Sequence, residues 1–313
     1  MDVVTSVGTS LLDEVHALVA SHEAATGSPG LSEDRLRALD RASTGATSER
    51  EPPHLVGVAA RHPGRPGLAG WAQVDGIGAG RTPTLEVVAP AELGGAAIDA
   101  LVDAVLAADA AAGGGPLRWW VHHAGDTDDA RAAARGFTLE RELLQMRCPL
   151  PLPARAAAGP TPTITTRAFR VGYDEAGWLI QNNRAFAGHP EQGQWDLDTV
   201  TAREREPWFD PDGFRILEVD GRIAGSCWTK VHRSAEPPLG EIYVIGVDPD
   251  FHGRGWGRAL TEDGFAWLAA AGLSHGMLYV DAANTAAVTL YTSMGMTVHH
   301  VNRAYIAPSV PPG

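Results

Sequence analysis

The chain has 313 residues, of which 44% are hydrophobic and 20% are charged, as expected for a globular protein long enough to form two domains. Its formal net charge of −13 argues against nucleic acid or an anionic membrane as its partner. The sequence has no basic segment ahead of an apolar run at its N-terminus, and Cys148 and Cys227 lack a metal-binding spacing, so we expect a cytoplasmic protein without a metal site.

Helices and strands alternate along the first half of the chain. The sequence predicts helices near residues 11–25, 31–39, 98–106 and 128–135, and strands near 54–61, 67–74, 84–88, 117–121 and 140–146. Residues 149–162 are rich in Pro and Ala and have no period, which is typical of a linker. We therefore predict a first domain at residues 1–150, a linker at 151–162 and a second domain at 163–313.

The second half repeats this alternation. Asp220-Gly221 between two β-branched runs is a strong hairpin signal, and it joins strands predicted at 214–219 and 223–231. A further strand at 242–247 is ended by Asp248-Pro249. The other elements predicted here are strands at 163–167, 278–280 and 298–306, and helices at 174–186, 258–271 and 287–294.

A glycine-rich loop connects the strand at 242–247 to the helix that follows. Gly253, Gly255 and Gly257 alternate with other residues, and Arg254 and Arg258 lie beside them. Glycine permits positive φ and close approach to phosphate oxygens, while a helix N-terminus offers unpaired N–H groups and partial positive charge. We therefore predict a diphosphate site. A glycine turn without a ligand is the alternative, and the spacing fits neither a dinucleotide fingerprint nor a P-loop.

A second motif follows the predicted strand at 278–280. Asn284 stands where a helix N-cap is expected, Gly295 where a C′ glycine is expected, and Tyr291 lies between them. Together the two motifs resemble the signatures of the GNAT superfamily of N-acetyltransferases, the first of which reads Gln/Arg-x-x-Gly-x-Gly/Ala. His252 takes the place of the usual Gln or Arg. The resemblance implies acetyl-CoA as co-substrate, with its diphosphate held by the loop.

The two halves of the chain resemble each other as an internal repeat. For example, Leu68-Ala69-Gly70-Trp71 corresponds to Ile223-Ala224-Gly225-Ser226. We therefore predict an α/β (α+β) fold of two tandem GNAT-like domains, each a mixed, mostly antiparallel, twisted sheet flanked by helices. The first half has the shorter Glu92–Ala96 in place of the arginine-bearing loop and Ala132 in place of Tyr291. We expect a degenerate first domain and place the chemistry in the second.

Acetyl transfer from a thioester to an amine requires a neutral amine, a polarised carbonyl and a protonated leaving thiolate. Tyr291 stands where the superfamily protonates the thiolate, although an aromatic at this spacing also suits a core. Glu241, at the start of the central strand, is a candidate base for the amine, although a single strand-end carboxylate is often solvated. Backbone N–H groups near Ile245–Val247 are expected to polarise the carbonyl, with Gly246 permitting a bulge that frees them.

The expected cofactor contacts lie mainly in the second half. Asn284 is expected to cap its helix, to bind the cofactor, or to do both. Paired histidines at 122–123 and 299–300 face opposite ways along a strand, so we expect no metal there. The full set of expected acetyl-CoA contacts is Ile245, Gly246, Val247, His252, Gly253, Arg254, Gly255, Trp256, Gly257, Arg258, Asn284, Ala287 and, in the first half, Val87 and Val88.

Longer blocks extend the resemblance to nearly the whole chain. The segments 183–193, 208–213, 228–232 and 239–249 resemble the mycothiol synthase family, tandem acetyltransferases of actinobacteria. That resemblance implies acetylation of the cysteinyl amine of cysteinyl-glucosaminyl-inositol (desacetylmycothiol) by acetyl-CoA, giving mycothiol. It also implies acceptor contacts at Glu33, Glu191, Lys230, Glu241 and Tyr279. A solvated strand lysine is the alternative for Lys230.

Two other functions stay open. An N-acetyltransferase for another small amine or a peptide N-terminus would keep the glycine loop and Tyr291 but not the acceptor region at 181–195. A non-enzymatic acyl-CoA-sensing module would need neither Tyr291 nor Glu241. In each case we expect a monomer with a small-molecule ligand, and neither nucleic acid nor membrane as a partner.

Overall fold

Most strands and helices follow the order that the hydrophobic periodicity predicts, whereas the strand Asp2–Val4 and the helix Leu197–Glu204 were not predicted. The computed structural model describes residues 2–4, 9–44, 56–64, 66–75, 82–111, 113–153, 162–188, 192–233 and 235–307. Contacts group the chain into unit 1, Met1–Leu143 with His300–Gly313, and unit 2, Leu144–His299. The domain boundaries expected at residues 150 and 162 stay a prediction, and most of the expected linker, residues 154–161, lies outside the described part.

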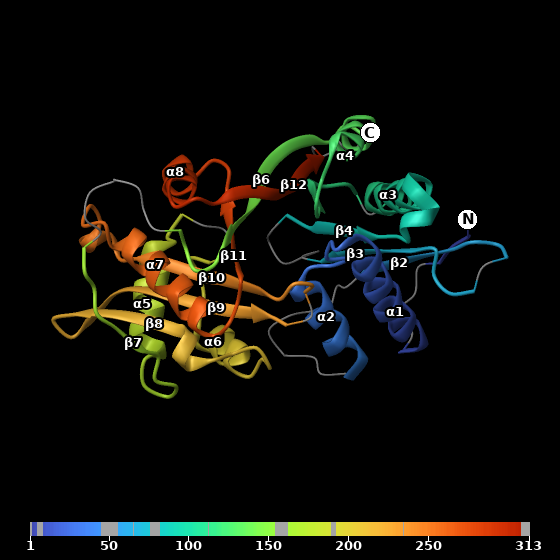
Figure 1. Cartoon of the computed structure of the whole chain (residues 1–313). Helices are drawn as coiled ribbons and strands as arrows, with labels where there is room; N and C mark the ends of the chain where they lie inside the picture. The colour runs from blue at the N-terminus through green and yellow to red at the C-terminus, as the bar shows by residue number, and fades with distance from the viewer. Residues whose placement is uncertain are drawn as a thin grey trace. The chain divides into compact units, whose positions relative to one another are not determined.

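Unit 1 consists of a mixed sheet with helices packed against it (Figure 1). Its strands follow the order β1-β2-β3-β4-β5-β12, and neighbouring strands are antiparallel except for the parallel pair β4–β5. Its helical elements are α1 (Thr9–Thr26), α2 (Glu33–Thr44), η1 (Ala91–Leu93), α3 (Gly94–Ala111) and α4 (Asp126–Ala133). Its strands are β1 (Asp2–Val4), β2 (Val56–Arg61), β3 (Gly70–Asp75), β4 (Thr84–Val88), β5 (Leu117–Val121), most of β12 (Thr297–Ala307) and the start of β6 (Thr138–Pro149).

Two apolar layers stabilise unit 1, one on each face of its sheet. Leu85 and Trp119 belong to the layer that includes α3, whereas Trp71 and Val88 belong to the layer that includes α1 and α2. None of these four side chains is more than 2% exposed. Because full burial of one large apolar side chain is worth about 1.5–3 kcal/mol, these layers supply much of the unit's stability.

Unit 2 repeats the same strand pattern (Figure 1). Its order is β7-β8-β9-β10-β11 followed by the end of β6, with antiparallel neighbours from β7 to β10 and a parallel pair β10–β11. Its strands are β7 (Thr166–Ala168), β8 (Phe214–Val219), β9 (Arg222–His232), β10 (Leu239–Val247) and β11 (His275–Asp281). Its helical elements are α5 (Glu175–Ala185), α6 (Leu197–Glu204), η2 (Pro211–Gly213), η3 (Pro249–Phe251), α7 (Trp256–Ala270) and α8 (Thr285–Ser293).

The hairpin between β8 and β9 confirms the turn predicted at Asp220-Gly221. Val219 pairs with Arg222, so two residues form the turn. Asp220 has φ +50° and Gly221 has φ +74°, the left-handed conformation that a two-residue hairpin turn with a matching twist requires at both positions. The turn thus sets the register between β8 and β9, and on its other edge β9 pairs with β10, where Lys230 lies opposite Glu241.

Helices cover both faces of the unit 2 sheet. One apolar cluster joins Leu260 and Phe265 of α7 and Tyr291 of α8 to Ile242 and Leu278 of the central strands. A second cluster, rich in tryptophan, packs α5 and α6 against β8 and β9 on the other face. The fold class predicted from the sequence, tandem mixed sheets flanked by helices, is therefore confirmed.

Helix α6, at residues 197–204, was not predicted from the sequence. Only Val200 is buried among its eight residues, so the apolar period is too weak to reveal it. Its N-cap, Asp196, is a residue type that favours this position, and its carboxylate accepts a hydrogen bond of 2.8 Å from the Thr199 N–H. The cap rather than the periodicity marks where this helix begins.

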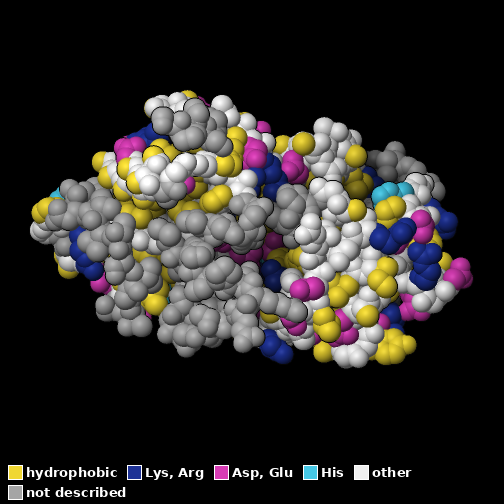
Figure 2. Space-filling view, turned by 180° about the vertical axis from the view of Figure 1, so that it is seen from behind, with side chains coloured by type: hydrophobic (Ala, Val, Ile, Leu, Met, Phe, Trp, Pro, Cys, Tyr) yellow, Lys and Arg dark blue, Asp and Glu magenta, His cyan; other side chains and the backbone are white. Residues whose placement is uncertain are grey.

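Figure 2 shows one face of the protein, on which charged side chains of both signs are visible. In Figure 2, Lys and Arg side chains on the face shown lie among Asp and Glu side chains. Across the described ranges, every helix is too short or too polar to cross a membrane.

Candidate active site

The two central strands of unit 2 pair only at their beginnings. Strand β10 pairs with β11 at Gly240–Gly276, Glu241–Met277 and Ile242–Leu278, and the described pairing ends there. On its other side β10 stays paired with β9 as far as Val247–Gly225. One edge of β10 beyond Ile242 therefore presents backbone N–H and C=O groups to an opening between the strands, where an extended ligand can hydrogen-bond.

A bulge lies in β10, but at a different residue from the one predicted. Ile242 pairs with Thr229 and Val244 with Trp228, so Tyr243 is the extra residue. Gly246, where the bulge was expected, is paired with Ser226 in regular register. Packing explains the glycine at position 246, because a Cβ there would lie 3.1 Å from the Ala185 Cβ of α5. The prediction of a bulge at Gly246 was therefore wrong: this glycine lets a helix approach the strand.

The N-terminus of α7 has the character of an anion site. Its N-cap, Gly255, has φ +74° and no side-chain cap, and the first turn contains no acidic residue. By contrast, Asp196 caps α6 and Asn284 caps α8 through their side chains. A Cβ at Gly253 or Gly257 would meet no atom within 4 Å. At Gly255 itself a Cβ would lie 3.2 Å from Pro162, so the open space is on the Gly253 and Gly257 sides. The first-turn N–H groups of α7 thus lack a side-chain cap and carry the positive end of the helix dipole.

The polar side chains of the glycine loop differ in the contacts that they make within the protein. His252 Nε2 donates a hydrogen bond of 2.9 Å to the Val247 carbonyl, and Arg258 donates to the Ser293 hydroxyl. The Arg254 guanidinium carbon lies 5.1 Å from the Trp256 ring centroid and 5.3 Å from that of Phe251. Within the described residues Arg254 makes no hydrogen bond, so this exposed cation is the most available to a phosphate.

An ion pair between a partly exposed arginine and a buried carboxylate anchors the start of the glycine loop. Arg184 of α5 donates to both carboxylate oxygens of Asp248, at 2.8 and 3.2 Å, and Asp248 is 1% exposed. Burial alone raises the pKa of the Asp248 carboxyl, but hydrogen bonds from Arg184 and from the Asp250 N–H hold that pKa below its ordinary value. From the sequence, Arg184 was placed in the acceptor region and Asp248 at the end of a strand, and the two were not predicted to pair. Their separation of 64 positions explains why no local pattern revealed the pair.

Asp248→Asn is expected to destabilise the protein by about 1–2 kcal/mol at neutral pH, less than a fully buried pair because Arg184 is 45% exposed. The folded-state pKa of Asp248 lies below the unfolded value of about 4, so its contribution is present above that pH and is lost as the pH falls through the folded value. Urea unfolding at neutral pH and near pH 3 should therefore show a gap between wild type and variant that narrows in acid. Asp250→Asn is the matched control, because Asp250 contacts the same arginine but is 53% exposed, and it should cost less than about 0.5 kcal/mol. Equal losses in both variants would contradict the anchoring role of Asp248.

Glu241 lies buried on the sheet face opposite the one that holds Ile242. It is 6% exposed, directly opposite Lys230 on β9, and its Oε2 lies 2.6 Å from Nε2 of His232. Lys230 is 5% exposed, and its Nζ lies 4.7 Å from the Trp208 ring centroid and 5.5 Å from that of Tyr243. The alternatives of a solvated Glu241 and a solvated Lys230 are therefore wrong. His232 is a partner that sequence reading did not single out.

Tyr291 lies in α8, in the apolar cluster that contains Ile242 and Leu278. It is 7% exposed, and no hydrogen bond to its hydroxyl is found among the described residues. Burial, with a smaller effect of Cys227, raises the pKa of Tyr291 well above its ordinary value, so the hydroxyl keeps its proton at neutral pH. Because Ile242 and Glu241 are neighbours on one strand, Tyr291 and Glu241 lie on opposite faces of the sheet. A group held between the diverging strands is accessible from both faces.

The remaining residues expected at the site in unit 2 lie around the diverging strands. Asn284 caps α8 by accepting a hydrogen bond of 3.1 Å from the Ala287 N–H, which confirms its expected capping role. The Tyr279 hydroxyl accepts a hydrogen bond of 2.8 Å from Gln145 Nε2. Glu191 lies outside the described residues, so its expected acceptor contact stays a prediction. Glu33 lies in unit 1, on α2, where it pairs with Arg37 at 3.1 Å.

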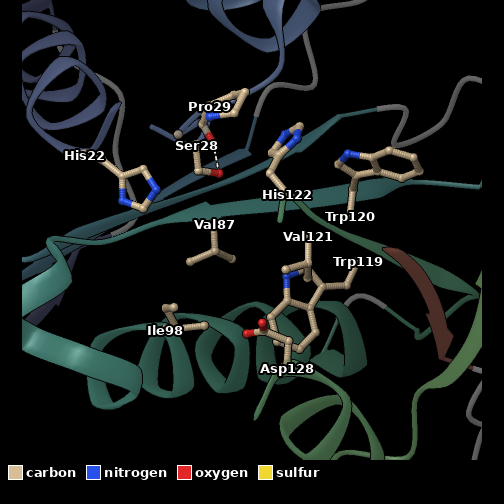
Figure 3. Close-up of a pocket in the computed structure, with 11 residues that line it drawn as sticks. His22, Ser28, Pro29, Val87, Ile98, Trp119, Trp120, Val121, His122 and Asp128 are labelled. Carbon is tan, nitrogen blue, oxygen red and sulfur yellow. Dashed lines mark hydrogen bonds between the residues drawn. The ribbon is translucent and has the colours of Figure 1, made fainter. Parts of the chain in front are cut away.

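Unit 1 has a corresponding divergence between β4 and β5, whose pairing ends at Leu85–Trp119. A pocket of about 100 Å³ lies there, lined in part by Val87, Trp119 and His122. Figure 3 shows His122 and Ser28 on one side of the strands and Ile98 and Asp128 on the other. The pocket therefore passes through the gap between the strands, and of the two expected contacts only Val87 borders it, since Val88 packs against α1.

The N-terminus of α3 in unit 1 differs from that of α7. A Cβ at Gly95 would overlap a guanidinium nitrogen of Arg131, so this arginine covers the first turn of α3. Arg131 also pairs with Asp128 at 3.1 Å and with Asp99 at 3.5 Å. The basic group that the sequence did not show in the Glu92–Ala96 loop thus comes from α4. It occupies space that is open at Gly253 and Gly257.

Comparison with known proteins agrees with this architecture. Residues 180–296 match the family described as the acetyltransferase (GNAT) family. Among solved structures, a tandem GNAT protein from the clavulanic acid biosynthesis pathway superposes with a TM-score of 0.65 at 15% identity, covering 100% of this chain and 99% of its own. A GCN5-related N-acetyltransferase from Sphaerobacter thermophilus gives a TM-score of 0.67 at 20% identity, covering 99% of this chain and 96% of its own. These two similarities establish the fold.

Proteins related in sequence identify the family more narrowly than the solved structures do. A protein named mycothiol acetyltransferase from Frankia alni is 40% identical over 316 residues, which cover 94% of this chain and 90% of the relative. A protein of the same name from Thermobispora bispora is 49% identical over 206 residues, covering 64% of this chain and 69% of the relative. By its similarity over nearly its whole length, the chain belongs to the mycothiol acetyltransferase family.

Proposed function

We propose that this protein transfers the acetyl group of acetyl-CoA to the cysteinyl amine of cysteinyl-glucosaminyl-inositol, giving mycothiol. The observation that carries the proposal is the uncapped N-terminus of α7 beside the point where β10 and β11 diverge, with Glu241 and Tyr291 on either face of that opening. Membership of the mycothiol acetyltransferase family supports the choice of acceptor.

The residues present fit the coenzyme. The N–H groups of Gly253–Arg258 would hold the diphosphate, because the helix dipole and the Arg254 guanidinium favour negative charge there. Backbone groups on the edge of β10 at Ile245–Val247 would hydrogen-bond the pantetheine arm. Asn284 and Ala287 border the arm from the first turn of α8. When bound, the coenzyme supplies an activated acyl thioester.

Three protein groups carry the chemistry in this proposal. Glu241 takes a proton from the acceptor ammonium and leaves a neutral amine, which is the nucleophile. Backbone N–H groups of the free β10 edge stabilise the negative charge that develops on the thioester oxygen. Tyr291 gives its proton to the leaving sulfur, a role that its raised pKa fits because the hydroxyl is protonated at neutral pH.

Polar groups on the Glu241 face of the sheet fit an aminosugar-inositol acceptor. Lys230, whose ammonium lies near the rings of Trp208 and Tyr243, is a donor suited to hydroxyl acceptors. Tyr279 on β11 supplies a phenol that is oriented by Gln145. Glu191 and Glu33 are proposed to contact the same acceptor, as the family resemblance implies.

A reaction with purified protein tests the proposal and separates it from both alternatives. Acetyl-CoA is incubated with a panel of amines that includes cysteinyl-glucosaminyl-inositol, and free thiol and product mass are followed together. N-acetylation gives one new thiol for each acetyl group gained by the acceptor, whereas acetylation of the acceptor thiol leaves the total unchanged. Preference for another amine would support a different N-acetyltransferase. Coenzyme binding without turnover of any amine would support an acyl-CoA sensor.

Unit 1 is proposed to hold a second, weaker acyl-CoA site beside Val87, the one of the two expected contacts that borders the pocket. The pocket beside Val87 supports this second site. Because Arg131 covers the first turn of α3, a diphosphate would be held there by other contacts than at the N-terminus of α7. Calorimetric titration with coenzyme A distinguishes the cases, because two sites give a stoichiometry of two and a single site gives one.

A further inference from the structure

His232 and Glu241 form a close pair near the turn of the β9–β10 hairpin. His232 lies at the end of β9 and pairs with Leu239, two residues before Glu241, so both side chains project from the same face of the sheet. Their Nε2 and Oε2 atoms lie 2.6 Å apart. Among the described residues, His232 is the one side chain that hydrogen-bonds the Glu241 carboxylate.

The two members of the pair differ in their access to solvent. The Glu241 side chain is 8% exposed, whereas that of His232 is 27% exposed. Nδ1 of His232, on the far side of the ring, makes no hydrogen bond within the described chain, and the ring belongs to a partly exposed side chain. The imidazole therefore connects the buried carboxylate to water through its two nitrogens.

Acetylation of an ammonium has a proton balance that makes this connection useful. For each turnover, an ammonium and a thioester become an amide, a thiol and one free proton. The proposed base, Glu241, holds a proton after it has acted and must lose it before the next turnover. Its burial removes direct contact with bulk water as an efficient route.

We infer that His232 carries protons from Glu241 to solvent, a role that rests on the proposed function. The Glu241 carboxylic acid passes its proton to Nε2 of the His232 tautomer that bears hydrogen on Nδ1, which gives a carboxylate and an imidazolium. The imidazolium then releases the Nδ1 proton to water, and tautomer exchange through water resets the neutral ring. Histidine suits this relay because its two nitrogens accept and release protons near neutral pH. His232 is a positioning and relay residue, since it acts through Glu241.

His232→Gln separates relay from positioning, because the Gln amide still donates to Glu241 but transfers no proton. In dilute buffer, at saturating acetyl-CoA and acceptor, kcat is expected to fall about 10- to 100-fold while KM for acetyl-CoA stays within about twofold. Added imidazole should restore kcat in a saturable way, since it accepts the proton from the site. His232→Ala should lose at least as much and regain activity with imidazole as well. His275→Gln, on an exposed histidine at the start of β11, is the matched control and should match wild type at every buffer concentration.

The outcomes distinguish this inference from the proposed function. If wild-type protein acetylates no amine, the proposed function fails first. If wild type is active and His232→Gln keeps its full kcat in dilute buffer, His232 only positions Glu241 and the relay is overturned. A His232→Gln rate that stays low at every imidazole concentration also overturns it. Wild-type activity, a slow variant and rescue by imidazole together establish the relay.

Discussion

Replacement of Tyr291 with Phe is expected to lower kcat by about 10²- to 10³-fold while the Kd for acetyl-CoA changes less than about threefold. The substitution removes only the hydroxyl group, and the ring keeps its packing against the cluster of Ile242 and Leu278. Without the phenol proton the sulfur must leave as a thiolate, so the loss falls on the chemical step. Because burial raises the pKa of Tyr291 further above its ordinary value of about 10, wild-type activity should not decline through loss of this proton below about pH 10.

Steady-state kinetics with a coenzyme A binding titration measure both effects. Tyr305→Phe is the matched control, because Tyr305 in unit 1 is also buried and has a raised pKa but donates its hydroxyl to Asp129 at 2.6 Å. It should keep near wild-type kcat. A Tyr291→Phe variant with unchanged turnover would remove the acid role and leave Tyr291 as a core aromatic.

Glu241→Gln is expected to lower kcat/KM for the acceptor by about 10²- to 10³-fold at neutral pH. The amide has nearly the shape of the carboxylate but does not accept the ammonium proton. The loss should be largest at low pH, where the acceptor amine is fully protonated, and should narrow above about pH 8, where an α-amine is largely neutral.

A pH–rate profile from about pH 6 to 9 for wild type and variant, at saturating acetyl-CoA, tests this expectation. Glu236→Gln, at an exposed glutamate in the turn between β9 and β10, is the matched control and should follow the wild-type curve. Parallel profiles for Glu241→Gln and wild type, with a constant ratio at all pH values, would count against a role in removing the amine proton.

Local sequence signals predicted the elements that build the site. The Asp220-Gly221 turn, the glycines at 253 and 255 with positive φ, and the Asn284 cap each depend on a few adjacent residues. Backbone conformation at these positions follows from the chemistry of single residues, so one sequence suffices to identify them.

Features that depend on contacts between distant residues were missed. The glycine rule suggested a bulge at Gly246, yet the bulge lies at Tyr243, because the close approach of α5 determines the glycine. Neither the Arg184–Asp248 pair nor the Arg131 cover of α3 follows from local periodicity. The contact between His232 and Glu241 was easier to predict, since the β9–β10 register places His232 diagonally across from Glu241. Finding it required the register of the hairpin as well as its sequence.

The account depends on a coenzyme seated between β10 and β11 with its diphosphate on the N-terminus of α7. A crystal structure of the protein with coenzyme A measures this directly. We predict phosphate oxygens within hydrogen-bond distance of N–H groups in Gly253–Arg258, and the coenzyme sulfur beside the Tyr291 hydroxyl. A diphosphate bound elsewhere in unit 2, or a sulfur that lies away from Tyr291 while the Gly253–Arg258 loop stays empty, would contradict the account.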